Sequence, residues 1–256
     1  MTAETGILAI VDALELPPEA RVNARVPKKL LVEQGAPTSA DKRAIQDGID
    51  DLQWLAACKP ATIGVQTYSD DIREYLEIAL ITCVFRPGAK VGRLITLIHR
   101  AIPYPIVLIT SDSDGIALSV AHKRHAQNEA GKVVIERIVS VGGLRAGWPS
   151  DQEQAFMDSL SLARQPRRSL FTLYEGWLAR IEALNAARLA GSFTVTDDMA
   201  SIERRRDALE AHSRLTREII GLRARANREK QLNRRVDLNL EIQRLESDLA
   251  THKKNL

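Results

Sequence analysis

The hydrophobic positions repeat with a helical period over the last part of the chain. Residues 199–256 contain no proline and one glycine, and Arg, Leu, Glu and Gln are abundant there. This composition predicts one long helix or a close pair of helices. A continuous helix of that length would extend roughly 85 Å, about three times the width of a small domain. We therefore expect another surface to cover its apolar side.

Two apolar seams lie within this segment, and each has the 4, 3, 4 spacing of a coiled-coil seam. They are out of phase with each other and are separated by the polar stretch Asn227–Arg235. The phase change argues against one uninterrupted coiled coil and favours a bent hairpin or an arm that touches two surfaces. The first seam is Leu215, Ile219, Leu222 and Ala226, and the second is Leu238, Ile242, Leu245 and Leu249. We predict that these seams bind a partner.

Helical and strand-like periods alternate in the first 150 residues. The connector Arg21–Gly35 is expected to be extended or partly helical. Asp112-Ser113-Asp114-Gly115 predicts a tight hairpin turn. Helices are predicted for Gly6–Leu14, for residues 38–57 with Trp54 on the apolar side, and for Val91–Ala101. Strands are predicted for Thr62–Gln66, Tyr75–Phe85, Ile106–Thr110, Ile116–His122 and Lys132–Val139, which are rich in β-branched and aromatic residues.

This order of elements predicts an α+β fold. The sheet should be mixed or mainly antiparallel, with about five strands and flanking helices. Strand character ends after Gly142-Gly143, and residues 150–189 are predicted to be helical with an interruption at Gln165-Pro166. The expected domains are an α+β module over residues 1–148 and a helical arm over residues 149–256. The arm should end in a long helix or hairpin at 197–256.

The charge is concentrated in the arm. Residues 1–150 carry 17 basic and 17 acidic side chains, whereas residues 151–256 carry 19 and 16. Within Arg214–Arg235, eight basic side chains accompany two acidic ones. This face could be a solvated surface, bind an acidic protein or bind nucleic-acid phosphates, although no aromatic residue is interleaved to stack bases. On one continuous helix, an arc of about 80° beside the first seam would hold Arg214, Arg217, Arg225, Arg228 and Arg235.

The remaining composition indicates an ordinary chain with no membrane segment. The hydrophobic content is 45% and the charged content 27%. No apolar run approaches the roughly 18 residues that a transmembrane helix needs, and the N-terminus lacks the basic region of a signal peptide. Cys58 and Cys83 have no CxxC spacing. A cytoplasmic location is expected.

No motif indicates a catalytic, metal or cofactor site, so the chain is expected not to be an enzyme. Asp70-Asp71, Glu74 and Glu77 suggest a metal-dependent nuclease, but the strand that follows lacks the lysine of an ExK motif. His99 is expected to be a charge partner at a helix C-terminus. His122 and His125 are expected in an exposed loop, with no third metal ligand nearby. Trp148 is expected to be an aromatic plug at the domain junction.

Several stretches resemble the bacterial family called domain of unknown function 4391. They occur in the family's order over nearly the whole chain, and each is a short motif. The resembling stretches are Val26-Pro27-Lys28-Lys29, Asp41-Lys42 leading to Trp54, Pro60-Ala61-Thr62-Ile63, Ala101-Ile102-Pro103-Tyr104-Pro105-Ile106, and Arg228-Glu229-Lys230-Gln231-Leu232-Asn233-Arg234-Arg235 leading to Leu238-Asn239. The resemblance implies a companion of DNA methyltransferases and helicases in restriction or phage-defence systems. It carries over no catalytic residues.

Together these observations predict a non-catalytic accessory subunit that docks through its C-terminal helices. The expected partner is a helicase or methyltransferase subunit, or a second copy of the chain. Two alternatives stay open: a direct DNA-binding protein that uses the arginine-rich helix, and a divergent metal-dependent nuclease. No cofactor is expected in any of these.

Overall fold

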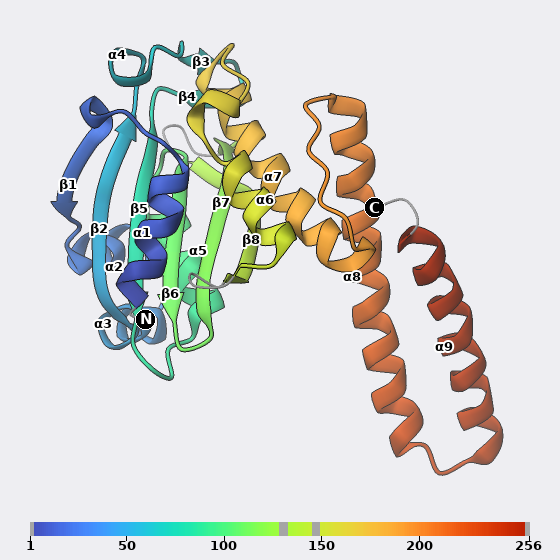
Figure 1. Ribbon diagram of the computed structural model, residues 1–256. Helices are drawn as coiled ribbons and strands as arrows, with labels where there is room; N and C mark the ends of the chain where they lie inside the picture. Colours follow the sequence, from blue (N-terminus) through green and yellow to red (C-terminus); the bar gives the residue numbers. More distant parts are fainter. Residues whose placement is uncertain (1–2, 128–132, 145–148, 254–256) are drawn as a thin grey trace. The chain divides into compact units, whose positions relative to one another are not determined.

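The computed structural model describes residues 3–127, 133–144 and 149–253 (Figure 1). Contacts divide the chain into two compact units, Met1–Ile181 and Glu182–Leu256. The division falls inside one helix, α7 (Leu170–Ala190), and so lies later than residue 148, where the sequence analysis placed it. Within the described ranges, no helix is both long and apolar enough to cross a membrane.

The first unit is built on a six-stranded mixed sheet, which confirms the predicted α+β class with one strand more than expected. The strand order is β1 (Arg21–Arg25), β2 (Ile49–Cys58), β5 (Ile78–Phe85), β6 (Ile106–Asp112), β7 (Gly115–His125) and β8 (Val133–Leu144). β5 and β6 are parallel and are connected through α5 (Val91–Ala101), whereas the other neighbouring pairs are antiparallel. A separate ribbon pairs β3 (Tyr68–Ser69) with β4 (Glu74–Tyr75).

Helices cover both faces of the sheet (Figure 1). One face packs against α2 (Lys28–Gly35), α3 (Ser39–Gly48) and α5. The other faces α1 (Ala3–Ala13), with α6 (Asp151–Ser159) beside it. Successive side chains of a strand point to opposite faces, so Leu108 of β6 joins the α5 core while its neighbour Ile109 is buried toward the α1 side. The first unit therefore has three layers.

The prediction of a helix over residues 38–57 is wrong in its second half. α3 ends at Gly48, where an added Cβ would lie 2.8 Å from Leu94 Cδ1, and β2 follows at once. β2 pairs with β1 on one side and β5 on the other. Its pairing with β5 shifts register between Ile49 and Asp51 and again between Trp54 and Ala56. Each shift breaks the two-residue alternation of a strand, so the buried positions acquire a spacing that imitates a helix.

The strand predicted at Thr62–Gln66 is also wrong, because the chain forms the short helix α4 (Pro60–Ile63) there. Pro60 occupies the first turn, and Gly64 ends the helix in the left-handed conformation with φ of 66°. Proline at the start and glycine at the end are ordinary signals of a helix. The segment Arg21–Gly35, expected to be extended or partly helical, contains the strand β1 and the helix α2. Single 3-10 turns lie at Pro18–Ala20 and Leu162–Arg164.

Other predictions are confirmed closely. α5 has the predicted bounds, and the β6–β7 hairpin turns at Asp112–Gly115, where the Asp112 carboxylate accepts a hydrogen bond from the Asp114 N–H at 2.8 Å. α6 and α7 are separated near Gln165-Pro166, as expected. The β8 prediction began at Lys132, which lies outside the described residues, as does Trp148.

Two aromatic residues hold the first half of α7 in the first unit. The Tyr174 hydroxyl accepts from the Ala121 N–H and donates to the Ile106 carbonyl, both at 2.7 Å, which ties α7 to β7 and β6. The Trp177 indole N–H donates to the Leu160 carbonyl at 2.9 Å. Both side chains are buried. These contacts explain why the compact unit extends past residue 148.

The second unit contains the end of α7 and two long helices, α8 (Met199–Arg228) and α9 (Leu232–Lys253). Asp198 caps α8 by accepting a hydrogen bond from the Ser201 N–H at 2.9 Å. Near that end, Arg206 pairs with Glu182 at 3.1 Å. α8 and α9 pack together as a hairpin with a connection of three residues. Of the two open possibilities, one helix or a pair, the structure has the pair.

Candidate functional site

The two apolar seams of the arm lie against each other. Ile219, Leu222 and Ala226 of α8 form a buried cluster with Ile242 of α9. Leu238, Leu245 and Leu249 pack around this cluster, and Leu215 is buried one turn earlier on α8. The two seams are out of phase in the sequence because they lie on two separate helices: α8 ends at Arg228, and α9 begins after a three-residue turn. The hairpin thus uses these side chains for its own packing, and its outer faces remain for a partner.

The outer face of α8 carries a row of arginines. Arg214, Arg217, Arg225 and Arg228 are exposed and span about 21 Å of helix. Within the described residues none of the four forms an ion pair, whereas nearby Arg223 pairs with Glu246 of α9. We call these four residues the α8 arginine row. Arg235, which the sequence analysis grouped with them, lies on α9 and is not part of the row.

Gly221 lies at the middle of the α8 arginine row. It is exposed, and a Cβ placed there would meet nothing within 4 Å. At 100° per residue it falls between Arg217 and Arg225 on the same face. Because Gly221 has no side chain, a ligand held by the neighbouring arginines can approach the helix backbone closely.

The outer face of α9 has a different character. Leu232, Val236 and Leu240 follow one another at steps of four residues and are 65%, 47% and 59% exposed. At 100° per residue they lie nearly opposite the seam that contains Ile242. Contiguous exposed apolar side chains are typical of a binding surface. Sequence reasoning missed this face, although its four-residue spacing is visible in the sequence.

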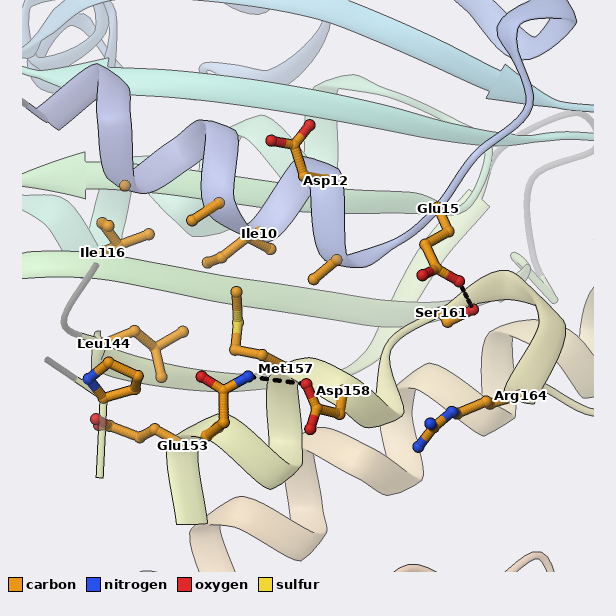
Figure 2. Close-up of a pocket in the computed structure, with 15 residues that line it drawn as sticks. Ile10, Asp12, Glu15, Ile116, Leu144, Glu153, Met157, Asp158, Ser161 and Arg164 are labelled. Carbon is orange, nitrogen blue, oxygen red and sulfur yellow. Dashed lines mark hydrogen bonds between the residues drawn. The ribbon is translucent and has the colours of Figure 1, made fainter. Parts of the chain in front are cut away.

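The first unit contains a cavity of about 540 Å³ between α1 and α6 (Figure 2). Its apolar lining comes from Ile10 of α1, Ile116 of β7, Leu144 at the end of β8 and Met157 of α6. Acidic side chains surround that lining: Asp12, Glu15, Glu153 and Asp158. None of these residues is predicted from the sequence to belong to a site, because each alone has the pattern of an ordinary core or surface position.

A buried polar cluster lies between β4, β7 and α7. His122 Nε2 is 2.6 Å from Glu175 Oε1, and His122 Nδ1 is hydrogen-bonded to the Tyr75 hydroxyl. Burial raises the pKa of the Tyr75 hydroxyl, so this group stays protonated. The prediction of an exposed loop is therefore wrong for His122, which belongs to β7, and His125 ends that strand in an exposed position. The cluster joins three elements and is not part of the lining of the cavity between α1 and α6.

His99 is also buried rather than a charge partner at a helix end. Its Nε2 lies 3.0 Å from Ser119 Oγ, and the side chain is 0% exposed. Burial holds the pKa of His99 well below its ordinary value, which keeps the ring neutral. The prediction failed because His99 lies on the face of α5 that packs against the sheet, where it meets Ser119 of β7.

The carboxylates considered for a nuclease take separate roles. Glu77 pairs with Lys59 at 2.8 Å. Asp70 accepts hydrogen bonds from the N–H groups of Ile72 and Arg73 in the turn between β3 and β4. Among the residues that the structure describes, no group of three or more His, Cys, Asp or Glu side chains is placed to hold a metal ion.

Lys123 of β7 is a buried amine of the first unit. Its Nζ donates to the carbonyl oxygens of Ile102 and, at 2.7 Å, of Tyr104. The side chain is buried, and the loss of hydration lowers the pKa of the amine to about 7. At pH 8 the folded chain therefore holds Lys123 largely neutral, whereas the unfolded chain holds it charged.

This difference predicts a pH dependence of stability. Between pH 7 and the ordinary lysine pKa of 10.5, unfolding takes up one proton, so the free energy of unfolding should rise with pH. The slope should be about 1.4 kcal/mol per pH unit and should vanish below pH 7. Urea unfolding between pH 7.5 and 8.5 measures it, and the Lys123→Met variant should lack it. Equal slopes in the two proteins would contradict the assignment.

Comparison with protein families gives a match that spans both units. Residues 14–249, which include most of both units, match a family described as domain of unknown function (DUF4391). The match agrees with the resemblance found in the sequence. Comparison with curated proteins gives no match, and comparison with solved structures gives none either.

Proposed function

The chain belongs to the domain of unknown function 4391 family, and from this premise we propose that it is an accessory subunit that binds nucleic acid through the α8 arginine row. One observation carries the proposal: four exposed arginines without ion pairs, within the described residues, lie along one face of a packed hairpin. An arginine that no protein carboxylate neutralises is available for a phosphate.

The chemistry of the row suits a phosphate backbone. Guanidinium groups bind phosphate oxygens through paired N–H donors, which is geometry that lysine lacks. The row spans about 21 Å, a length over which each strand of duplex DNA presents several phosphates. Such contacts position a protein on DNA without reading its sequence. We therefore expect binding that depends little on base order.

The family resemblance supports DNA as the nucleic acid. It implies companions of methyltransferases and helicases, so the proposed setting is a bacterial restriction or phage-defence complex that acts on DNA. In that setting the hairpin would hold the complex on the duplex while another subunit performs the chemistry. The Ile219 and Ile242 seams stabilise the hairpin itself, so a protein partner would contact other surfaces.

The test is the salt dependence of binding by the full-length chain. We expect fluorescently labelled duplex DNA to bind with a slope of log affinity against log salt of about −3 to −4, which is roughly 0.9 per bound phosphate. Affinity should then fall about a hundredfold between 50 and 200 mM salt. The absence of binding at the lower salt concentration, or a slope near zero, would remove DNA binding by this row.

A further inference from the structure

The outer face of α9 carries a row of apolar side chains, Leu232, Val236 and Leu240, that stays exposed in the described part of the chain. We call these three residues the α9 apolar row. α8 packs against the opposite side of α9 (Figure 1). Gln243 and Ser247 continue the row toward the C-terminus, so about four turns of this face carry no charge along their middle. Such a face is typical of a surface that meets another protein.

Two opposite charges lie beside the α9 apolar row on the same flank. At about 100° per residue, Asp237 and Arg244 are about 20° apart around the helix, and Arg244 lies about 40° from Leu240. Both side chains are exposed, and neither forms an ion pair within the described residues. Seven residues, or about 10 Å along the axis, separate the two charges. Each is therefore available to a group outside this chain.

An antiparallel second copy of α9 would bring these charges together. A two-fold axis that passes across two antiparallel helices places the same flank of each helix side by side and reverses the chain direction. Asp237 and Arg244 are equally distant from the midpoint between positions 240 and 241. An axis at that midpoint therefore sets each residue against the opposite charge of the other copy. Further out on the same flank, Arg234 and Asp248 are almost equally distant from the midpoint and also differ in charge.

The same axis brings the apolar side chains of the two helices together. Leu240 lies within about 1 Å of the axis along the helix, so it meets Leu240 of the second copy. Leu232 then lies opposite Ala250, which is on the same line of α9 near its other end. Glu241 is also close to the axis, but it lies about 100° around the helix from Leu240 and points away from the contact. Apolar and charged positions therefore agree on one register.

We propose that two copies of the chain pair through the outer faces of their α9 helices, antiparallel about a two-fold axis between positions 240 and 241. The two Leu240 side chains form the apolar centre of the contact. Two equivalent ion pairs, each between Asp237 of one copy and Arg244 of the other, fix the register. Because one face of each copy contacts the same face of the other, the assembly closes as a dimer. The contact uses none of the α8 arginine row, so it stands apart from the proposed binding of nucleic acid.

Charge exchange tests this pairing in the full-length chain without nucleic acid. Sedimentation equilibrium at about 50 mM salt should show a dimer that weakens at about 500 mM, because the ion pairs are screened. Asp237→Arg alone, or Arg244→Asp alone, sets like charges together in both pairs and should weaken dimerisation at least about tenfold. An equimolar mixture of the two variants should dimerise about as strongly as the original chain, because one copy then supplies both cations and the other both anions.

Matched controls change the same charges elsewhere. Asp207→Arg on α8 and Arg43→Asp on α3 alter exposed residues and should leave dimerisation unchanged. Circular dichroism should show the same helix content in all variants. Single charge variants that dimerise normally, or a mixture of them that stays monomeric, would overturn the proposal. A monomeric original chain at low salt would also overturn it and would leave the α9 apolar row to a different protein.

Cysteine cross-linking tests the direction of the pairing. Cys58 and Cys83 are buried, so cysteines introduced on the outer face of α9 report on that face. Antiparallel pairing places position 233 of one copy beside position 247 of the other, and keeps the two copies of position 233 about 20 Å apart. Oxidation of a mixture of the Asn233→Cys and Ser247→Cys variants should therefore link one variant to the other. Efficient linking within either variant alone would contradict the antiparallel arrangement.

Discussion

Replacing Arg214, Arg217, Arg225 and Arg228 together by glutamine should lower the affinity for duplex DNA by roughly two orders of magnitude or more at about 50 mM salt. Each arginine that binds a phosphate releases a condensed counterion, so replacing all four removes most of the salt-dependent part of the affinity. The slope of log affinity against log salt should become shallower by about 1 for each arginine replaced. Fluorescence anisotropy over a salt series measures both quantities.

Two matched controls distinguish the effect of the α8 arginine row on affinity from the effect of net charge. Glutamine at Arg21, Arg43, Arg100 and Arg168 removes four exposed arginines of the first unit, with the same change in net charge, and should change the affinity little. Lysine at the four positions of the row keeps the charge and should keep most of the slope. Glutamine is a good helix former, so circular dichroism should show an intact α8. An equal loss of affinity in the first control would show that DNA binding depends on overall charge and not on the α8 arginine row.

Replacing Trp177 by alanine should lower the free energy of unfolding of the first unit by about 3–5 kcal/mol. Trp177 is 2% exposed, and its indole N–H donates to the Leu160 carbonyl at 2.9 Å. Alanine would leave a cavity between α7 and its neighbours and would strand a buried carbonyl. Because small domains are stable by only about 5–15 kcal/mol, the change is a large fraction of the total. Urea unfolding followed by fluorescence of Trp54, in β2 of the same unit, measures it.

The Trp177→Phe variant separates packing from hydrogen bonding. Phenylalanine keeps most of the apolar volume but has no N–H to donate, so its cost should be nearer to about 1–3 kcal/mol, the penalty of one buried group left without a partner. A cost below about 1 kcal/mol for the alanine variant would mean that Trp177 is not packed as described.

The fold could be predicted where local signals agreed. α5 combines a helical repeat with prolines just beyond its end. The β6–β7 hairpin combines two apolar strands with a sequence that strongly favours a tight turn. β2 could not be recognised, because the register shifts around Ile49 and Trp54 remove the alternation that defines a strand. The information that makes β2 a strand comes from its neighbours β1 and β5, and not from its own order of residues.

The candidate surfaces could be predicted only in part. The seams and most of the α8 arginine row are periodic and lie on contiguous residues, so the sequence shows them. It could not show that the seams meet each other, because a hairpin and an extended arm share the same pattern. The cavity has no local signal, because it exists only where α1 and α6 come together, and Glu15 and Ser161 are 146 residues apart.

That separation has a consequence for the time at which the cavity forms. The α8–α9 hairpin closes over three residues, so its folding needs little loop closure and should be fast once both helices are made. The cavity instead needs the hydrogen bond from the Leu162 N–H to the Leu14 carbonyl and the contact of Glu15 with Ser161. At synthesis rates of about 5–20 residues per second, α1 is synthesised about 7–30 s before α6. In a nascent chain the side of α1 that meets α6 therefore stays uncovered for that interval, and the acidic cavity forms only when the first unit is complete.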